Sequence, residues 1–579
     1  MTDSRYPGIA SNKLWYEAFS TSPVAFPVRY PDGRWAGPPA NAGSNPMNEV
    51  QNSGYTDTFR PALQSVFTVN QKLDFITKGL SAYARFSFDS YSEFNNKRTG
   101  GVDLWYTNQR DGNGELVFGK PIKEGSDELY YEHSDTGERV IYTEANISYD
   151  RTFGHHNVNG MVLYNMRNRM IATAGSAIAS IPYRNQAIAA RFGYGYKERY
   201  LAEVNGSYTG SENFAPGHRF GFFPAASVGW VISNEPFFKN MTRTVDLLKL
   251  RASYGIVGND KMENARFLYM AGAWSGYNTV AKGQGSWQFG KDGGTGLLPD
   301  AKENTMGNPD VTWEKVAKQN YGIDLKMFDS RLSLTADVFF EKRKDILSTR
   351  NTLPAITDIN LPKINLGKVN NHGYELSLGW NDRAGKVDYW LKANVSYAKN
   401  KIIYMDEVVP NEPYMAETGR STGLTYGYIF DRFLQKDDFD ADGNLKKDEN
   451  GRQILPQMAL GTPRPGDALF KDLNGDGVIN GDDKTRFGYA ERPDYVFGFL
   501  GGLKWKNFEF SMQWTAAMNA SRILDGEYRN AFGSTNSRML LKFLADGRWT
   551  EENPNSRFPR LTFMNKSHYL QTSDLWLMN

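Results

Sequence analysis

Residues 331–340, Arg-Leu-Ser-Leu-Thr-Ala-Asp-Val-Phe-Phe, alternate between apolar and polar side chains. On an extended chain, one face carries Leu332, Leu334, Ala336, Val338 and Phe340, and the opposite face carries Arg331, Ser333, Thr335, Asp337 and Phe339. This period of two predicts a β-strand with one apolar face. Residues 320–327 repeat the alternation, and the short segment 328–330 between the two stretches predicts a tight β-hairpin.

The same alternation recurs in residues 391–397 and 508–514. Along the whole chain we identify roughly sixteen strand candidates and almost no helix. A half-buried strand of a soluble sandwich also alternates, but long strands that repeat one apolar and one charged face are typical of a barrel in lipid with a polar lumen. We therefore predict an all-β fold, a transmembrane antiparallel β-barrel.

The connections between these strand candidates alternate between short and long. Short turns are expected near 153–156, 196–199, 328–330, 381–386 and 505–507, and long polar segments near 91–138, 258–312, 345–370 and 402–494. Aromatic residues lie beside the short turns: Phe153, Tyr194, Tyr196, Phe328, Trp380, Tyr389, Trp390, Trp505 and Phe508. Short turns at one rim, long loops at the other and an aromatic belt favour an outer-membrane barrel, although aromatics also have an ordinary preference for strands.

The composition excludes several other classes of protein. The chain has 579 residues with 40% hydrophobic content and a mean hydropathy of −0.57. Its most apolar stretch, residues 222–232, is far shorter than the roughly 20 residues of a spanning helix. Cysteine is absent, so no disulfide is possible, and the formal net charge of +2 does not favour a nucleic-acid partner.

One loop motif has the spacing of an EF-hand-type calcium site. Its predicted oxygen ligands are Asp472, Asn474, Asp476, the Val478 carbonyl, Asn480 and Asp483. Gly477 at position 6 allows the sharp turn, and Ile479 is placed to pin the loop to the protein. Because calcium prefers several oxygen ligands in a flexible shell, we predict a structural calcium ion here. The alternative is an Asx-rich turn without metal.

A second stretch matches the same pattern formally, with Asp438, Asp440, Asp442 and, at position 12, Glu449. The sequences on either side of Leu445 to Lys447 also read as two turns of a loop hairpin. The second calcium site is therefore the weaker hypothesis.

We find no catalytic motif in the sequence: no nucleophile elbow, zinc cluster or phosphate loop is present, so we do not expect an enzyme. Aromatic residues in the segment 258–312 are candidates for stacking on a bound sugar, or else for packing within the loop: Trp274, Tyr277, Trp287 and Phe289.

Five sequence blocks follow one another along the chain. They are RFGYGYKERYLAEVN at 191–205 with 219–232 and EPFF at 235–238; LKLRASYGIVGN at 248–259; NPDVTWE at 308–314 with NYGID at 320–324; NLGKVNNHGYE at 365–375; and PGD at 465–467 with KDLNGDG at 471–477. In order and spacing, from about residue 55 onward, the chain resembles the SusC/RagA-type TonB-dependent transporters of Bacteroidetes outer membranes.

The resemblance implies that residues 57–579 belong to a barrel domain of roughly 22 strands, incomplete at the C-terminus, and that residues 1–56 form an extracellular loop region between barrel strands. It also implies an outer-membrane location, a SusD-like lipoprotein partner, energy from TonB through a plug not found in this chain, and import of glycans or peptides. Residues 1–8 lack the apolar region of a signal peptide, so we expect a processed chain or part of a longer one, unable to transport alone.

The alternative function is a secreted calcium-binding all-β glycan-binding protein or glycosidase. The aromatic content of 14% and the Asp-rich loops fit it. It predicts shorter strands and a pair of carboxylates flanking an aromatic cleft, and it leaves the long loops at one rim unexplained.

Overall fold

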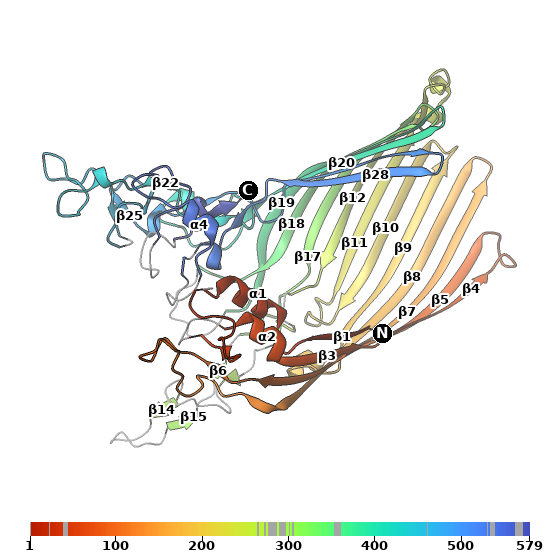
Figure 1. The fold of residues 1–579 in the computed structure, drawn as a ribbon. Coiled ribbons are helices and arrows are strands. Elements are labelled where there is room, and N and C mark those ends of the chain that lie inside the picture. Colours follow the sequence, from red (N-terminus) through yellow and green to blue (C-terminus); the bar gives the residue numbers. More distant parts are fainter. Residues whose placement is uncertain are drawn as a thin grey trace.

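The structure, a computed structural model, describes residues 2–22, 24–38, 44–262, 266–270, 274–275, 286–288, 297–299, 302–303, 306–352, 361–459, 461–529, 531–532, 539–561 and 571–578. One strongly curved antiparallel sheet of 16 strands dominates it (Figure 1). The prediction of an all-β chain built on long antiparallel strands is confirmed.

The strands follow one another in space largely in chain order. They are β1 (Thr2–Pro7), β3 (Gly54–Arg60), β5 (Leu80–Gly101), β7 (Ser126–Phe153), β8 (His156–Ile171), β9 (Tyr183–Tyr196), β10 (Tyr200–Ser211), β11 (Phe220–Val231), β12 (Val245–Asn259), β17 (Glu314–Met327), β18 (Leu332–Ser348), β19 (Ile364–Ala384), β20 (Val387–Tyr404), β27 (Tyr495–Trp505) and β28 (Phe508–Met518), with β4 (Ala62–Lys72) beside β3 on β5. Among the residues that the structure describes, no pairing joins β28 to β1 or β4, so the sheet is open along one seam.

The hairpin predicted at 328–330 is present between β17 and β18. Met327 lies opposite Leu332, and Leu325 lies opposite Leu334. Phe328, Asp329 and Ser330 have φ angles of 61°, 58° and 62°, a left-handed conformation that is uncommon outside glycine. The Ser330 amide donates to the Asp246 carboxylate at 2.7 Å, which helps to hold this turn.

The two rims of the sheet differ as expected, with short turns at one and long connections at the other (Figure 1). The prediction that 91–138 forms one long loop is wrong, however. β5 continues to Gly101 and β7 begins at Ser126, so only residues 102–125 connect them. Likewise, β18 reaches Ser348 and β19 begins at Ile364 within the expected loop 345–370.

The remaining elements are short. The helices are α1 (Ser11–Ser20), α2 (Pro46–Asn52), α3 (Ala177–Ser180) and α4 (Lys542–Asp546), and the 3-10 turns are η1 (Ile232–Asn234), η2 (Pro236–Phe238), η3 (Pro413–Met415), η4 (Lys436–Asp438), η5 (Gly481–Asp483), η6 (Gly526–Tyr528) and η8 (Asp574–Trp576). The minor strands are β2 (Trp35–Ala36), β6 (Leu104–Trp105), β13 (Trp274–Ser275), β14 (Ser286–Gln288), β15 (Leu297–Pro299), β16 (Lys302–Glu303), β21 (Thr425–Gly427), β22 (Phe430–Phe433), β23 (Gln457–Met458), β24 (Ala468–Phe470), β25 (Val478–Ile479), β26 (Thr485–Phe487), β29 (Arg522–Ile523) and β30 (Leu577–Met578). Among the described residues, none of the helices has the length and apolar character to cross a membrane.

Residues 2–53 contain both a strand and a loop region. Residues 2–7 form β1 and pair with β3, and residues 8–53 carry α1, β2 and α2 at the long-loop end of the sheet (Figure 1). The domain boundary at 56/57 stays a prediction.

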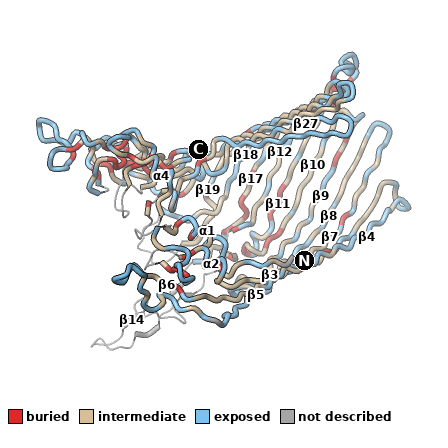
Figure 2. Tube along the Cα trace, viewed as in Figure 1, coloured by how far each residue is buried: buried red, intermediate tan, exposed pale blue. Residues whose placement is uncertain are grey.

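The packed core of the molecule lies mainly in the loops, not on a face of the sheet. Figure 2 shows buried residues gathered at the long-loop end, whereas most strand positions are intermediate or exposed. The largest buried cluster consists of Tyr428, Phe433, Leu434, Phe439, Leu445, Met458, Ala468, Leu469, Phe470, Ile479 and Trp549. We call the unit built on this cluster, residues 405–494 with the described parts of 519–578, the loop body.

Candidate functional site

The register of the sheet sorts side chains into one apolar and one polar face. One row across seven strands reads Leu248, Leu325, Leu334, Leu378, Ala393, Phe499 and Trp514. The next row, on the opposite face, reads Lys249, Asp324, Thr335, Ser377, Asn394, Gly498 and Thr515. The apolar face is open: Phe222 and Trp514 are each 64% exposed and Phe508 is 72% exposed. An exposed apolar surface that extends across many strands requires a nonpolar surrounding such as lipid.

Aromatic residues mark two levels on the apolar face. Tyr374, Tyr397 and Tyr495 lie side by side on adjacent strands toward the long loops. Trp380 lies toward the short turns, six residues after Tyr374, which corresponds to about 20 Å along an extended strand. Trp505 and Phe508 pair at the same rim. Two aromatic levels with this spacing match the girdles on either side of the roughly 25 Å apolar band of outer-membrane barrels.

Charged groups on the polar face form pairs that cross several strands. Arg251 donates to Asp324 at 3.2 Å and reaches Asp337, two strands away, at 2.6 Å. Gly322 lies between them, and a Cβ there would be only 2.5 Å from the Arg251 guanidinium carbon. Further ion pairs on this sheet join Arg60 to Glu93 and Lys318 to Glu341. This face is therefore polar but of mixed sign.

A cavity of about 1090 Å³ lies on this polar face near the short turns. Its lining includes Asn157, Glu203, Ser227, Lys249, Arg251 and Asn320. Acidic, basic and amide side chains together suit a hydrated polar lumen, and the lining does not select one sign of charge.

The loop body is closed by the C-terminal segment. The Arg560 guanidinium pairs with Asp467, which is completely buried, at 2.8 Å. The Phe430 amide donates to the Asp574 carboxylate at 2.6 Å, and burial raises the pKa of Asp574. Contacts between residues 93 and 144 positions apart in sequence therefore join these segments into one folded unit.

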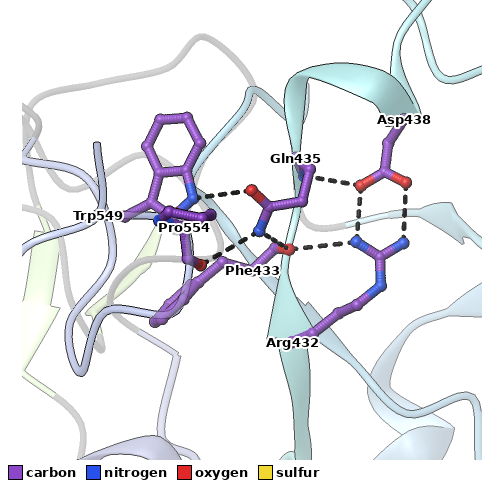
Figure 3. Close-up of polar contacts among 6 residues, drawn as sticks. All are labelled: Arg432, Phe433, Gln435, Asp438, Trp549 and Pro554. Atoms are coloured by element: carbon purple, nitrogen blue, oxygen red, sulfur yellow. Dashed lines mark hydrogen bonds and ion pairs between the residues drawn. The ribbon is translucent and has the colours of Figure 1, made fainter. Parts of the chain in front are cut away.

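Figure 3 shows a polar cluster on β22 and η4 within this unit. Arg432 holds Asp438 through two hydrogen bonds of 2.6 and 2.9 Å, and the Gln435 amide donates to the same carboxylate at 2.7 Å. Burial alone would raise the pKa of Asp438, but these donors outweigh burial and hold the pKa below its ordinary value.

Gln435 also connects the cluster to the C-terminal segment. Its side-chain amide donates to the Phe433 carbonyl at 3.0 Å and to the Pro554 carbonyl at 3.3 Å, and its side-chain oxygen accepts from Trp549 Nε1 at 3.3 Å (Figure 3). Trp549 packs in the main cluster of the loop body. This bridge was not predictable, because no motif links the two segments.

The predicted calcium loop, 472–483, closes on itself through its carboxylates. Asp472 accepts from the Gly475 and Gly477 amides at 2.7 and 2.8 Å, and the buried Asp483 accepts from the Leu473 and Asn480 amides at 2.8 Å. Three further predicted ligands also accept hydrogen bonds within the loop: Asn474 from the Asp476 amide, Asp476 from the Val478 amide and Asn480 from the Asp482 amide. Ile479 is completely buried in the loop-body cluster, so its expected pinning role is confirmed.

The carboxylates of this loop contribute to a raised pKa at the neighbouring Tyr414. The Tyr414 hydroxyl donates to the Asp482 carbonyl at 2.6 Å. Burial, together with the nearby carboxylates of Glu412, Asp483, Asp482 and Asp472, raises the pKa of Tyr414 to about 12. In the part of the chain that is described, no group of three or more His, Cys, Asp or Glu side chains is placed to hold a metal ion. The calcium site stays a prediction.

The second Asp-rich stretch has a different geometry. Asp438 is engaged by Arg432, and Asp440 Oδ1 accepts from the Asp442 and Asn444 amides at 3.0 and 2.8 Å. The same turn recurs at Asp448, which accepts from the Asn450 and Arg452 amides at 2.9 and 2.8 Å, and at Asp111, which accepts from the Asn113 and Glu115 amides. This geometry corresponds to the hairpin-turn interpretation. Calcium binding by Asp438, Asp440, Asp442 and Glu449 stays a prediction.

The predicted sugar-contact residues are largely undescribed. The backbones of Trp274 and Trp287 belong to β13 and β14, and Tyr277 and Phe289 lie outside the described residues. Their role stays a prediction.

Comparison with known proteins agrees with this geometry. The chain is 28% identical to TonB-dependent receptor P39 of Formosa agariphila over 75% of this chain and 40% of that protein. It is 27% identical to TonB-dependent receptor SusC of Bacteroides thetaiotaomicron over 57% of this chain and 30% of that protein. The chain thus spans less than half the length of these curated relatives.

Solved structures show the same fold at low identity. A structure of the RagAB peptide transporter matches 92% of this chain and 55% of that chain, with a TM-score of 0.63 and 16% identity. The RagAB peptide importer in its open-open state gives a TM-score of 0.64 at 17% identity, over 92% of this chain and 54% of that chain. The family described as TonB dependent receptor-like, beta-barrel matches residues 4–536. This chain belongs to the TonB-dependent receptor-like β-barrel family.

Proposed function

We propose that this chain is the barrel part of an outer-membrane importer that takes up oligosaccharides or peptides, driven through TonB, together with a SusD-like surface lipoprotein. The observation that carries the proposal is the two-faced sheet, in which the row Leu248 to Trp514 faces lipid and the row Lys249 to Thr515 faces a polar lumen. Such a sheet, completed into a barrel, encloses a route for polar solutes.

Several findings support this proposal. Proteins of this family lie in the outer membrane and are not enzymes, which agrees with the sequence expectations. The name of one similar structure, the RagAB peptide transporter, supports peptides as a cargo class. Glycans and a lipoprotein partner are what the resemblance of the sequence blocks to SusC/RagA-type transporters implies. The loop body supplies a large folded surface at the long-loop rim, where a surface partner would dock. The open apolar face gives no support to the secreted alternative, because a soluble protein would bury it.

Uptake by intact cells tests the proposal. Cells with and without this gene would be given labelled neutral oligosaccharides and, separately, labelled peptides. We expect one class of label to accumulate only in cells that carry the gene, and a proton uncoupler or deletion of tonB to abolish the accumulation. Uptake that is independent of the gene, or insensitive to both treatments, would contradict the proposal.

We also propose that the loop 472–483 binds calcium. The support is the ligand spacing from Asp472 to Asp483, which supplies five side chains and the Val478 carbonyl as oxygen ligands. A bound cation would stabilise the loop body because it binds the ordered loop and not the unfolded one.

A further inference from the structure

Four exposed aromatic rings from two distant segments form a continuous row at the long-loop end of the sheet. Trp15 and Phe19 lie one turn apart on α1, with ring centroids 6.0 Å apart. Phe19 meets Tyr528 at 6.5 Å, and Tyr528 meets Phe543 of α4 at 6.3 Å. The successive ring planes differ by 23°, 41° and 30°, so the row turns gradually. We call these four residues the aromatic row; α1 and α4 lie close together in Figure 1.

The aromatic row is open to solvent along its length. Trp15 is 65% exposed, Phe19 43%, Tyr528 46% and Phe543 41%. Aromatic side chains usually bury most of their surface, so four exposed neighbours in ring contact form a ready binding surface. The apolar belts on the strands have lipid to cover them, whereas this row lies among the loops.

The row is anchored in the protein core at one end. Phe543 contacts Phe558 with ring centroids 5.5 Å apart, and Phe558 stacks on Trp576 at 5.9 Å. Phe558 is only 4% exposed and Trp576 only 1%. The exposed rings therefore continue an internal aromatic stack and are held in position by it.

Hydrogen bonds fix α1, which supplies the other end of the row. The Ser20 carbonyl accepts from the Met539 amide at 2.9 Å, which ties α1 to the segment before α4. The buried Glu17 carboxylate accepts from the Ser44 amide at 3.0 Å. A fixed surface loses little conformational freedom when a ligand binds.

The size and surroundings of the row indicate the ligand. From typical areas of aromatic side chains, the four rings expose on the order of 400 Å², about half of what each partner of a stable protein complex buries. Several exposed neighbours in the sequence are polar and of both signs, namely Asn12, Lys13, Asp525, Lys542 and Asp546. The adjacent Tyr16 is a further aromatic residue, 50% exposed. A sugar ring has an apolar C–H face surrounded by hydroxyl groups, which matches aromatic faces bordered by neutral and mixed-charge hydrogen-bonding groups.

We infer that the aromatic row is a binding site for a neutral oligosaccharide, with successive sugar rings stacked on Trp15, Phe19, Tyr528 and Phe543. The inference rests on the proposed import function and names glycans, over peptides, as the cargo class. It gives the long-loop rim a site that collects cargo before entry into the lumen.

Calorimetry on the full transporter, purified in detergent from outer membranes, tests the inference. The probes are neutral hexasaccharides of α- and β-linked glucose, mannose and xylose. We expect at least one to bind, and Trp15→Ala and Tyr528→Ala each to weaken its affinity at least tenfold, while Trp15→Phe retains most of it. Phe75→Ala is the matched control, because Phe75 is 79% exposed at the opposite, short-turn rim, and it should change affinity less than twofold.

Three results would overturn the inference: no hexasaccharide binds, the row variants bind as well as the wild type, or the row variants lose a co-purifying lipoprotein while saccharide affinity is unchanged. Uptake measured on the same variants separates this inference from the proposed function. TonB-dependent peptide uptake without saccharide binding would overturn the inference alone. Saccharide binding that depends on the row, without any TonB-dependent uptake, would overturn the proposed function alone.

Discussion

At the residue scale, Gly466 is a position at which the two parts of the loop body approach each other closely. Its φ is +85°, and a Cβ there would lie 2.4 Å from the Trp549 ring. We predict that Gly466→Ala destabilises the loop body by about 2–4 kcal/mol, because left-handed strain and a clash with a buried ring act together. Hydrogen exchange at the amides of β22 and β24 measures this effect.

Gly443 provides the matched control for this prediction. Its φ of +81° is almost the same, but a Cβ there meets no atom within 4 Å. Gly443→Ala should therefore cost only the left-handed strain, about 1–2 kcal/mol. Equal effects of the two substitutions would show that the contact between Gly466 and Trp549 does not hold the loop body together.

The pair Arg432 and Asp438 makes the stability of the loop body depend on pH. The pKa of Asp438 is lowered in the folded state from an ordinary value of 3.8, so its contribution is present above that value and is lost as the pH falls through the lowered pKa. We predict that Asp438→Asn costs about 1 kcal/mol at pH 7, allowing for the solvent around Arg432.

Thermal unfolding of wild type and Asp438→Asn, followed by tryptophan fluorescence from pH 2.5 to 7, checks this prediction. Asp574 has a pKa raised by burial, so its ionisation costs stability at neutral pH and its contribution improves on acidification. Because Asp574 is present in both proteins, the difference between them isolates Asp438. A difference that stays constant down to pH 2.5 would contradict the prediction.

At the scale of the element, the sequence predicted those strands that have lipid on one side and the lumen on the other. The hairpin of β17 and β18 is an example, because each face imposes a different side-chain polarity. The outer parts of β5 and β7 escaped prediction, since residues 95–98 and their partners 131–134 are all polar or aromatic and show no alternation. Water on both faces removes the period of two that identifies a strand.

The candidate sites were predictable to the extent that their residues are adjacent in sequence. The loop from Asp472 to Asp483 was found by its spacing alone, and the burial of Ile479 followed from the same pattern. The link between Gln435 and Trp549 depends on tertiary packing, so no local pattern shows it. The aromatic row was missed for the same reason, since Phe19 meets Tyr528 from the opposite end of the chain.

Removal of calcium tests the loop 472–483 as an element. We predict a dissociation constant of roughly 10⁻⁵ to 10⁻³ M, in the range of sensor and extracellular sites, and faster hydrogen exchange in the loop after chelation. Asp476→Asn should weaken binding at least tenfold. Asp442→Asn, which changes the other Asp-rich stretch, should leave it unchanged. Calcium titrations measured by calorimetry compare the two variants with the wild type. The absence of any heat of binding in the wild type would exclude the site.

At the scale of the whole molecule, the loop body and the sheet differ in how their apolar side chains are kept from water. The loop body hides its apolar side chains internally, with Tyr428 and Phe470 each 1% exposed, as a soluble domain does. The sheet buries few apolar side chains within the protein, because lipid covers its apolar face and its other face is polar. The curved sheet thus holds the loop body at the long-loop rim.

This division leads to a prediction for two adjacent residues on β18. Leu334 lies in the apolar row, and Thr335 lies in the polar row, where its hydroxyl donates to Asp324 at 3.4 Å. Leu334→Lys should destabilise the membrane-inserted protein by about 2–4 kcal/mol, because a charge then faces the middle of the bilayer. Thr335→Lys adds the same charge beside Asp324 on the polar face, so it should cost less than about 1 kcal/mol.

The two lysine variants are compared by the folding of the full-length transporter into lipid vesicles. The folded fraction is scored by heat-modifiable migration across a urea series. Equal tolerance of both lysines would mean that the apolar face does not contact lipid, and it would remove the observation on which the transport proposal rests.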